Sequence, residues 1–174
     1  MNLLDDLEPG PKVPDEIYVV VEIPKGSGHK YEYKDGAFFL DRVLYSTLTP
    51  FFDYGIIPQT LTGDGDPLDV LVLVDKPSFS GCVITARPIG ILITSDEKGM
   101  DDKLIAVPKD DPRYNEIKKM EDLPKHTPKE LEFFFTHYKK LEPGKFVKVE
   151  RFGDAEEAKK VILESIETYK KSKK

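Results

Sequence analysis

The chain has 174 residues, and its 26 Lys and Arg against 32 Asp and Glu give a formal net charge of −6. Its 39% of hydrophobic residues suffices for one sizeable core, whereas the 33% of charged residues and the lack of any long apolar run argue against a membrane-spanning segment. The acidic balance disfavours a nucleic-acid binder, because such proteins usually carry a basic face.

Several features of the sequence indicate where the protein works and how many domains it has. Cys82 is the only cysteine, so no intrachain disulfide can form and a reducing, cytoplasmic location is expected. The first residues show neither the basic nor the apolar stretch of a secretory signal. Asn and Gln together occur three times while Lys and Glu are abundant, a pattern typical of thermophile proteins. No repeat or linker interrupts the chain, so we expect one domain over residues 1–174.

Predicted strands dominate the chain up to about residue 150. Alternation within Lys30–Lys34 places Lys30 and Glu32 on one face, and Asp35-Gly36 predicts a tight hairpin turn to the next strand. The remaining candidates are mostly apolar, as expected for strands buried in a barrel or sandwich. They are Ile17–Ile23, Ala37–Asp41, Asp69–Val74, Cys82–Thr94, Lys103–Val107 and Phe146–Val149.

Two amphipathic helices are predicted after the strands. The first has Thr127 as its expected N-cap, with Pro128 at the first helical position and Glu130 completing a capping box. Its apolar stripe is formed by Leu131, Phe134, Phe135, Tyr138 and Leu141. The second begins at the N-cap Asp154, with Glu157 as its capping-box partner, and ends in lysines that suit the helix dipole. The fold class is therefore mainly β (α+β), with two flanking helices.

The sharpest local feature is the segment Asp64-Gly65-Asp66-Pro67-Leu68-Asp69, directly before a predicted buried strand. Its three carboxylates can converge on one point outside the sheet, and hard cations such as Mg²⁺ prefer oxygen ligands of this kind. The same residues are good turn formers, so an ordinary turn is the alternative interpretation.

A second acidic loop and four charged strand residues extend this candidate site. The loop is Asp96–Lys103, although a solvated connection between strands has a similar composition. Glu22, Lys30, Glu32 and Arg42 lie within or at the ends of strands that a small barrel would bring together; the alternative is the solvated face of an antiparallel sheet. Carboxylates holding Mg²⁺ beside Lys and Arg indicate a phosphate site, because Mg²⁺ usually shares its shell with substrate phosphates.

The segment Asp64–Val70 resembles the signature of the soluble family I inorganic pyrophosphatases, and further elements follow in that family's order. They are Val21-Glu22-Ile23-Pro24, Lys30-Tyr31-Glu32, Asp41-Arg42, Asp53-Tyr54-Gly55, Arg87-Pro88-Ile89-Gly90, Asp96-Glu97, Asp101-Asp102-Lys103, Ala106-Val107-Pro108 and His137-Tyr138-Lys139. The match runs from about Pro14 to the C-terminal helix, and the short archaeal or bacterial type is the most similar. The resemblance implies a small OB-like closed β-barrel with two flanking helices and a site at its mouth.

The resemblance also implies Mg²⁺-dependent hydrolysis of pyrophosphate to two phosphates, with several ions per site and other divalent cations also usable. By family position, Asp66 is the general base toward the attacking water and Glu22 acts through metal-bound water. The implied metal ligands are Asp64, Asp69, Asp96 and Asp101. Phosphate oxygens are expected to be held, within a ring of polar residues that includes Glu32, by Lys30, Arg42, Tyr54, Lys103, Tyr138 and Lys139.

One departure from the family concerns Pro50, which falls where the family usually has a tyrosine. The resemblance implies a homo-oligomer, hexameric in the short members, without nucleic-acid or membrane partners.

Two other functions are weighed against this one. A non-catalytic OB-type nucleic-acid module would stack bases on Tyr31 and Tyr33 beside a basic groove. A metal-binding structural protein would bind the ions without turnover.

Overall fold

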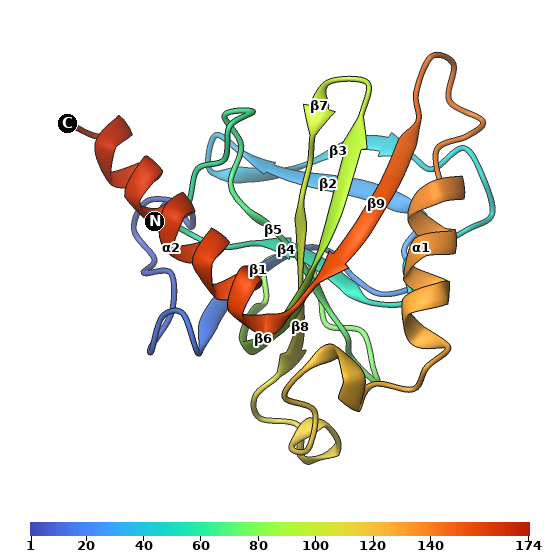
Figure 1. The fold of residues 1–174 in the computed structure, drawn as a ribbon. Coiled ribbons are helices and arrows are strands. Elements are labelled where there is room, and N and C mark those ends of the chain that lie inside the picture. The colour runs from blue at the N-terminus through green and yellow to red at the C-terminus, as the bar shows by residue number, and fades with distance from the viewer.

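A computed structural model describes residues 1–174, and a closed ring of five strands lies at its centre (Figure 1). The ring order is β1 (Ile17–Ile23), β4 (Asp53–Ile56), β5 (Asp69–Val72), β8 (Lys103–Pro108) and β6 (Val83–Asp96). Pairing of β1 with β6 closes it, and all neighbours are antiparallel except β5 and β8, which run parallel. The predicted small closed barrel is thereby confirmed.

Further strands extend the ring at one end. The far end of the long β6 pairs with β7 (Gly99–Met100) and with β9 (Val147–Gly153). Strands β2 (His29–Lys34) and β3 (Ala37–Val43) form a separate hairpin that crosses the upper part of the molecule in Figure 1. Asp35 and Gly36 adopt φ of 51° and 81°, as the predicted turn requires.

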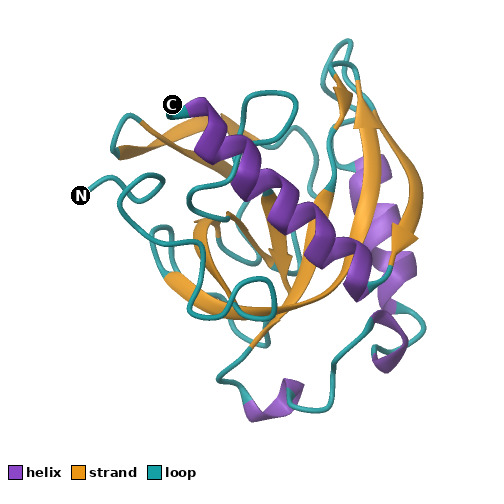
Figure 2. Ribbon diagram, turned by 60° about the vertical axis from the view of Figure 1, so that its left-hand side comes forward, coloured by secondary structure: helices purple, strands orange, loops and turns teal.

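Two helices cover the ring, and Figure 2 shows α2 (Ala155–Ser172) crossing it diagonally with α1 (Thr127–His137) set apart from it. Helix α2 buries Ala158, Ile162 and Ile166 against side chains of the ring. Helix α1 buries a second, aromatic core, in which the rings of Phe52 and Phe135 stack with centroids 5.7 Å apart. None of the helices combines the length and apolar character that crossing a membrane requires.

The helix starts differ in part from the sequence-based expectation. Thr127 is the first residue of α1 rather than its N-cap, and the N-cap His126 makes no side-chain capping bond. The reason is that the backbone of His126 is already helical, whereas a capping side chain needs an extended backbone. Asp154 does cap α2 and accepts from Glu157 N at 2.9 Å, but the Glu157 carboxylate pairs with Arg151 instead of completing the box.

The end of α1 also differs from the predicted stripe. The helix ends at His137, and Tyr138 is its C-cap. Leu141 lies beyond the end in a turn and is 65% exposed, so it takes no part in the apolar core. The predicted stripe is correct for Leu131, Phe134 and Phe135, which are buried.

Candidate active site

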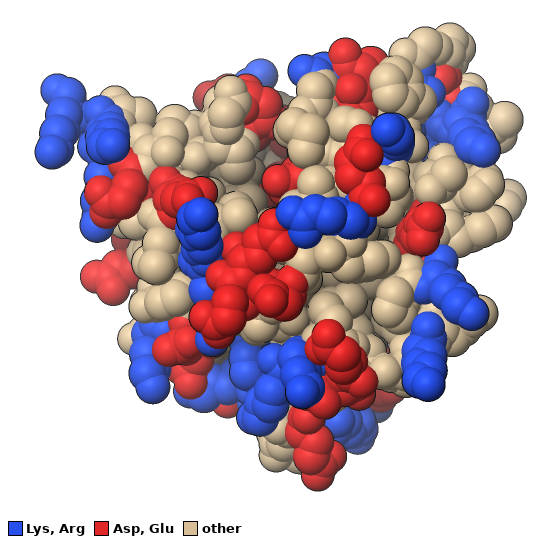
Figure 3. All heavy atoms as spheres, in the orientation of Figure 1, with Lys and Arg blue, Asp and Glu red and all other residues tan.

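Two acidic loops meet at one end of the ring because β5 and β8 are parallel neighbours. Asp69, the first residue of β5, lies opposite Lys103, the first residue of β8. The loops that lead into these strands border a cavity of about 440 Å³ together with α2, and its lining includes Asp64, Asp69 and Asp101. Figure 3 shows a hollow with acidic atoms along its border in the upper part of this face.

Lys103 is the buried cation at the centre of this end. Its Nζ lies 2.8 Å from Tyr54 Oη, 3.2 Å from Asp69 Oδ2 and 3.0 Å from Asp101 Oδ2, and its side chain is only 4% exposed. Burial alone would lower the pKa of Lys103, but its anionic and phenolic neighbours raise it well above its usual value. Lys103 is therefore a fixed positive charge between two carboxylates.

The segment around Asp66 forms a tight turn. Thr62 Oγ1 donates to Asp64 Oδ1, Asp66 N donates to the same carboxylate oxygen at 3.0 Å, and Gly65 adopts a φ of 88°. The Asp66 carboxylate makes no hydrogen bond within the protein, and the residue is exposed. The turn interpretation is thus correct for the backbone, and the Asp66 carboxylate takes no part in the hydrogen bonds of this turn.

The carboxylates of this region disfavour one another's ionisation. Partial desolvation of the carboxylate raises the pKa of Asp66, and Asp64, Asp69 and Glu32 add to the rise. Burial likewise raises the pKa of Asp69. Burial raises the pKa of Glu22 to about 8, although a 2.7 Å hydrogen bond from Tyr33 N opposes this. A divalent cation would relieve this excess of negative charge.

The carboxylates at this end of the ring are hard oxygen donors of the kind that divalent cations prefer, but they do not form a complete metal site by themselves. No three acidic, His or Cys side chains lie close enough together to enclose an ion by themselves. Mg²⁺ usually takes one or two carboxylates and completes its shell with waters and substrate phosphates. Asp64, Asp69 and Asp101, around an open cavity, supply carboxylates of this kind.

The second acidic loop meets the turn after α1. Lys139 Nζ lies 3.7 Å from both Asp96 Oδ2 and Glu97 Oε2, and burial lowers the pKa of Lys139 despite these neighbours. Glu97 lay within the predicted acidic loop without an assigned role, and the structure places it beside Asp96 at the same lysine. Tyr138 packs its ring on Phe134 at 5.1 Å, while burial raises the pKa of its phenol.

The β2–β3 hairpin supplies two further cations, Lys30 and Arg42. Lys30 pairs with Arg42 across the two strands, and Lys30 Nζ lies 3.4 Å from Asp41 Oδ2. Arg42 Nε donates to the same oxygen at 3.0 Å, and Arg42 Nη1 donates to the buried Glu142, which the sequence did not suggest. Burial opposes ionisation of Asp41, but Arg42 and Lys30 hold its pKa below the usual value.

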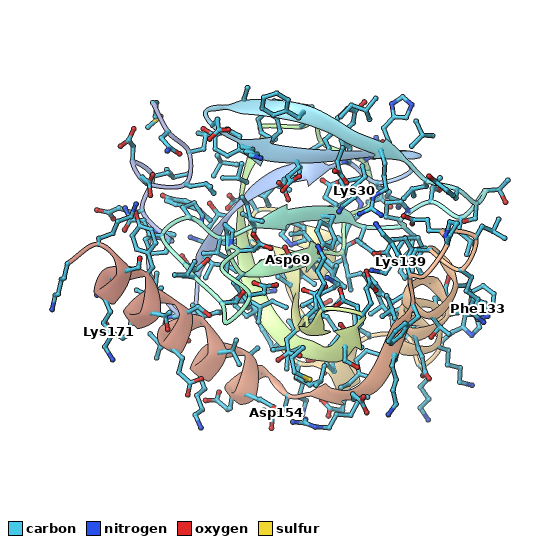
Figure 4. The ribbon with its side chains drawn as sticks, turned by 90° about the horizontal axis from the view of Figure 1, so that it is seen from above. Lys30, Asp69, Phe133, Lys139, Asp154 and Lys171 are labelled. Carbon is cyan, nitrogen blue, oxygen red and sulfur yellow. The ribbon has the colours of Figure 1, made fainter.

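The predicted site residues therefore approach one another from separate elements. In Figure 4, Lys30 from β2, Asp69 from β5 and Lys139 from the turn after α1 are arranged around one end of the ring. Asp154, the N-cap of the outer helix α2, and Lys171, in its last turn, lie away from this end. Pro50 is buried, and its carbonyl oxygen accepts from Gly26 N at 2.7 Å.

Comparisons with known proteins agree with this geometry. A family model described as inorganic pyrophosphatase matches residues 19–170. An inorganic pyrophosphatase of Aquifex pyrophilus is 51% identical over 173 residues, covering 97% of this chain and 98% of that protein. One of Nanoarchaeum equitans is 51% identical over 158 residues, covering 90% and 99%. The crystal structure of the Thermus thermophilus inorganic pyrophosphatase superposes with a TM-score of 0.95 at 43% identity, covering 98% of this chain and 99% of that one.

Proposed function

The chain belongs to the inorganic pyrophosphatase family and hydrolyses pyrophosphate to two phosphates, and we propose that it does so with Mg²⁺ at the open end of the strand ring. The ions would be held by Asp64, Asp69, Asp96 and Asp101. The observation that carries this proposal is the convergence of Asp69 and Asp101 on Lys103 beside the cavity. Other divalent cations fit the same oxygen donors.

Bound Mg²⁺ supplies charge neutralisation for the substrate and lowers the pKa of water. The chain's own contribution begins with Asp66, which accepts the proton of the attacking water as general base. Its carboxylate suits this step because no protein hydrogen bond occupies it and its raised pKa makes it a stronger base than an ordinary Asp. Glu22 and Glu32 support the step from the neighbouring strands.

The basic and phenolic side chains hold the phosphate oxygens. Lys103 and Tyr54 lie at the centre, Lys139 and Tyr138 on the α1 side, and Lys30 and Arg42 on the hairpin side. A substrate bound among them would exchange the carboxylate partners of these cations for phosphate oxygens. Positioning and electrostatic stabilisation of this kind account for most of the catalysis in phosphoryl transfer. Pro50 contributes no phenol, so this set lacks the additional tyrosine that the family usually has.

The proposal for Mg²⁺ is tested by phosphate release from pyrophosphate. We expect turnover with Mg²⁺, loss of turnover in EDTA, and recovery when Mg²⁺ is returned in excess. Turnover that survives complete removal of divalent ions would overturn the metal requirement. Titration of Mg²⁺ into Asp69→Asn, with Asp35→Asn in the exposed hairpin turn as a matched control, should show weaker Mg²⁺ activation only in the first variant.

We further propose a homo-oligomer, with a hexamer as the expected form. Large apolar side chains on the surface support it: Phe133 at 55% exposure, Leu141 at 65% and Phe146 at 54% follow one another around α1 and the turns after it. Figure 4 shows Phe133 on the outer side of this helix. Light scattering after gel filtration should give six times the 19.8 kDa of the chain, and a mass of 19.8 kDa would contradict the proposal.

A cytoplasmic location is proposed from the single cysteine.

The nucleic-acid module is not favoured by the structure. Tyr33, one of the two tyrosines that would stack bases, is only 6% exposed, and its hydroxyl accepts a hydrogen bond from Leu3 N at 2.9 Å. Its ring packs against Phe38 with centroids 5.0 Å apart. Base stacking needs an exposed aromatic face, which Tyr33 does not present.

A further inference from the structure

Glu142 is a buried carboxylate for which the proposed reaction has no direct use. Its side chain is 4% exposed, and Oε1 accepts from Arg42 Nη1 and lies 3.6 Å from Lys145 Nζ. Its other oxygen, Oε2, is buried and has no hydrogen-bond partner. A buried carboxylate has lost its hydration, which is unfavourable. It would also repel a polyanionic substrate bound nearby. This arrangement points to a role for Glu142 through the cation that it contacts.

The guanidinium of Arg42 is held at two of its three nitrogens. Nε donates to Asp41 Oδ2 at 3.0 Å, Nη1 donates to Glu142, and Nη2 makes no hydrogen bond within the protein. The group is planar and rigid, so fixing two nitrogens fixes the direction of the third. Nη2 therefore remains available, with two N–H donors, for the oxygens of a phosphate.

The position of Glu142 in the chain links this contact to the other side of the site. Glu142 N donates to Lys139 O at 3.0 Å, and Lys145 N donates to Glu142 O at 3.2 Å, so the residue is fixed in the turn after α1. The same turn carries Tyr138 and Lys139. The contact thus ties the hairpin that bears Arg42 to the element that bears two other proposed phosphate ligands.

We infer that Glu142 is a positioning residue that holds Arg42 with Nη2 directed toward the substrate phosphate, and the inference rests on the proposed phosphate-binding role of Arg42. Asp41 alone is a weaker constraint, because it is a partly exposed carboxylate that also faces Lys30. Glu142 is buried, belongs to another element, and contacts the end nitrogen rather than Nε.

The test is steady-state kinetics with magnesium pyrophosphate, together with inhibition by inorganic phosphate. Glu142→Ala should raise both KM and the phosphate inhibition constant about tenfold, as expected for the loss of one charge-assisted hydrogen bond. Glu142→Gln keeps an acceptor oxygen and should recover part of the loss. Glu132→Ala, an exposed glutamate on α1 without a hydrogen-bond or ion-pair partner, is the matched control and should behave as wild type.

A double-mutant cycle separates this inference from its premise. Arg42→Lys should raise KM by itself, and adding Glu142→Ala to it should change KM little further, because no guanidinium remains to be oriented. If Arg42→Lys leaves KM unchanged in an active enzyme, the role of Arg42 is wrong and the inference falls with it. If Arg42→Lys raises KM but the two effects are additive, only the inference is overturned. A Glu142→Ala enzyme with a lower Tm and unchanged KM and phosphate inhibition would likewise overturn it.

Discussion

Lys103 Nζ lies 3.2 Å from Asp69 Oδ2, and the two residues lie opposite each other at the start of neighbouring parallel strands. One ammonium group thus stands among the carboxylates proposed to bind metal. It neutralises part of their charge, and we propose that it also serves as a phosphate ligand when metal and substrate are bound.

Lys103→Met is expected to destabilise the metal-free enzyme. The substitution leaves Asp69 and Asp101 without their shared cation, and removing one partner of a buried pair costs about 3–5 kcal/mol, less here because both carboxylates are partly exposed. Thermal unfolding in EDTA should show a clear fall in Tm. The surface variant Lys109→Met, which breaks an exposed pair with Glu16, should change Tm little. Equal Tm values for the two variants would contradict the central role of Lys103.

Asp66→Asn is expected to leave the fold intact and to slow turnover about 10²–10⁴-fold, the usual contribution of a general base. The fold should survive because the Asp66 carboxylate makes no hydrogen bond within the protein. The measurement is kcat at saturating substrate together with the circular dichroism spectrum. An unchanged kcat would remove Asp66 from the base role.

Tyr138→Phe is expected to separate packing from substrate binding. The ring stacks on Phe134 at 5.1 Å, and Phe keeps this contact while losing the hydroxyl. Tm should therefore stay near that of wild type, whereas KM for pyrophosphate should rise about tenfold through the loss of one hydrogen bond to a charged group. Tyr138→Ala, which also removes the ring, should lower Tm. A normal KM for Tyr138→Phe would mean that the residue serves the core alone.

Glu22 gives the metal-free enzyme a specific pH dependence. Its pKa is about 8 in the fold, above the ordinary value of 4.5, mainly because of burial. A carboxyl group whose pKa is raised in the fold contributes its full stability at pH values below its pKa in the unfolded chain. This contribution is lost as the pH rises through about 8. Glu22→Gln in EDTA should therefore gain stability relative to wild type between pH 5 and 9. Parallel Tm curves for the two proteins over this range would contradict the shift.

Most strands could be predicted from the sequence because their apolar runs are long or alternate regularly, as in Ile17–Ile23. Strand β4 could not, since it has four residues and contains Gly55, a poor strand former. The structure explains this glycine: a Cβ at Gly55 would lie 2.3 Å from the carbonyl oxygen of Val20 on β1. The close approach of β1 and β4 thus requires a glycine at position 55, and this glycine hides β4 from a prediction based on strand propensity.

The site could be predicted from the sequence only in part. Asp64, Asp66 and Asp69 form a dense local pattern, but spacing alone left an ordinary turn open, and the family resemblance was needed to assign their roles. Glu142 gave no signal, because its partner Arg42 is distant in sequence and the contact depends on how the turn after α1 meets the hairpin. The capping expectation for Thr127 was wrong because the preceding residue, His126, is already helical.

The closure of the ring between β1 and β6 bears on how the chain acquires its activity. It joins Ile17 to Ala86, and the parallel pair β5–β8 forms only after Lys103 has been synthesised. Contacts this distant in sequence slow folding, because a long loop must close before they form. Asp69 and Lys103 therefore come to lie opposite each other only when the chain through β8 pairs with β5. The carboxylates proposed to bind metal on these two segments are accordingly brought together by closure of the ring.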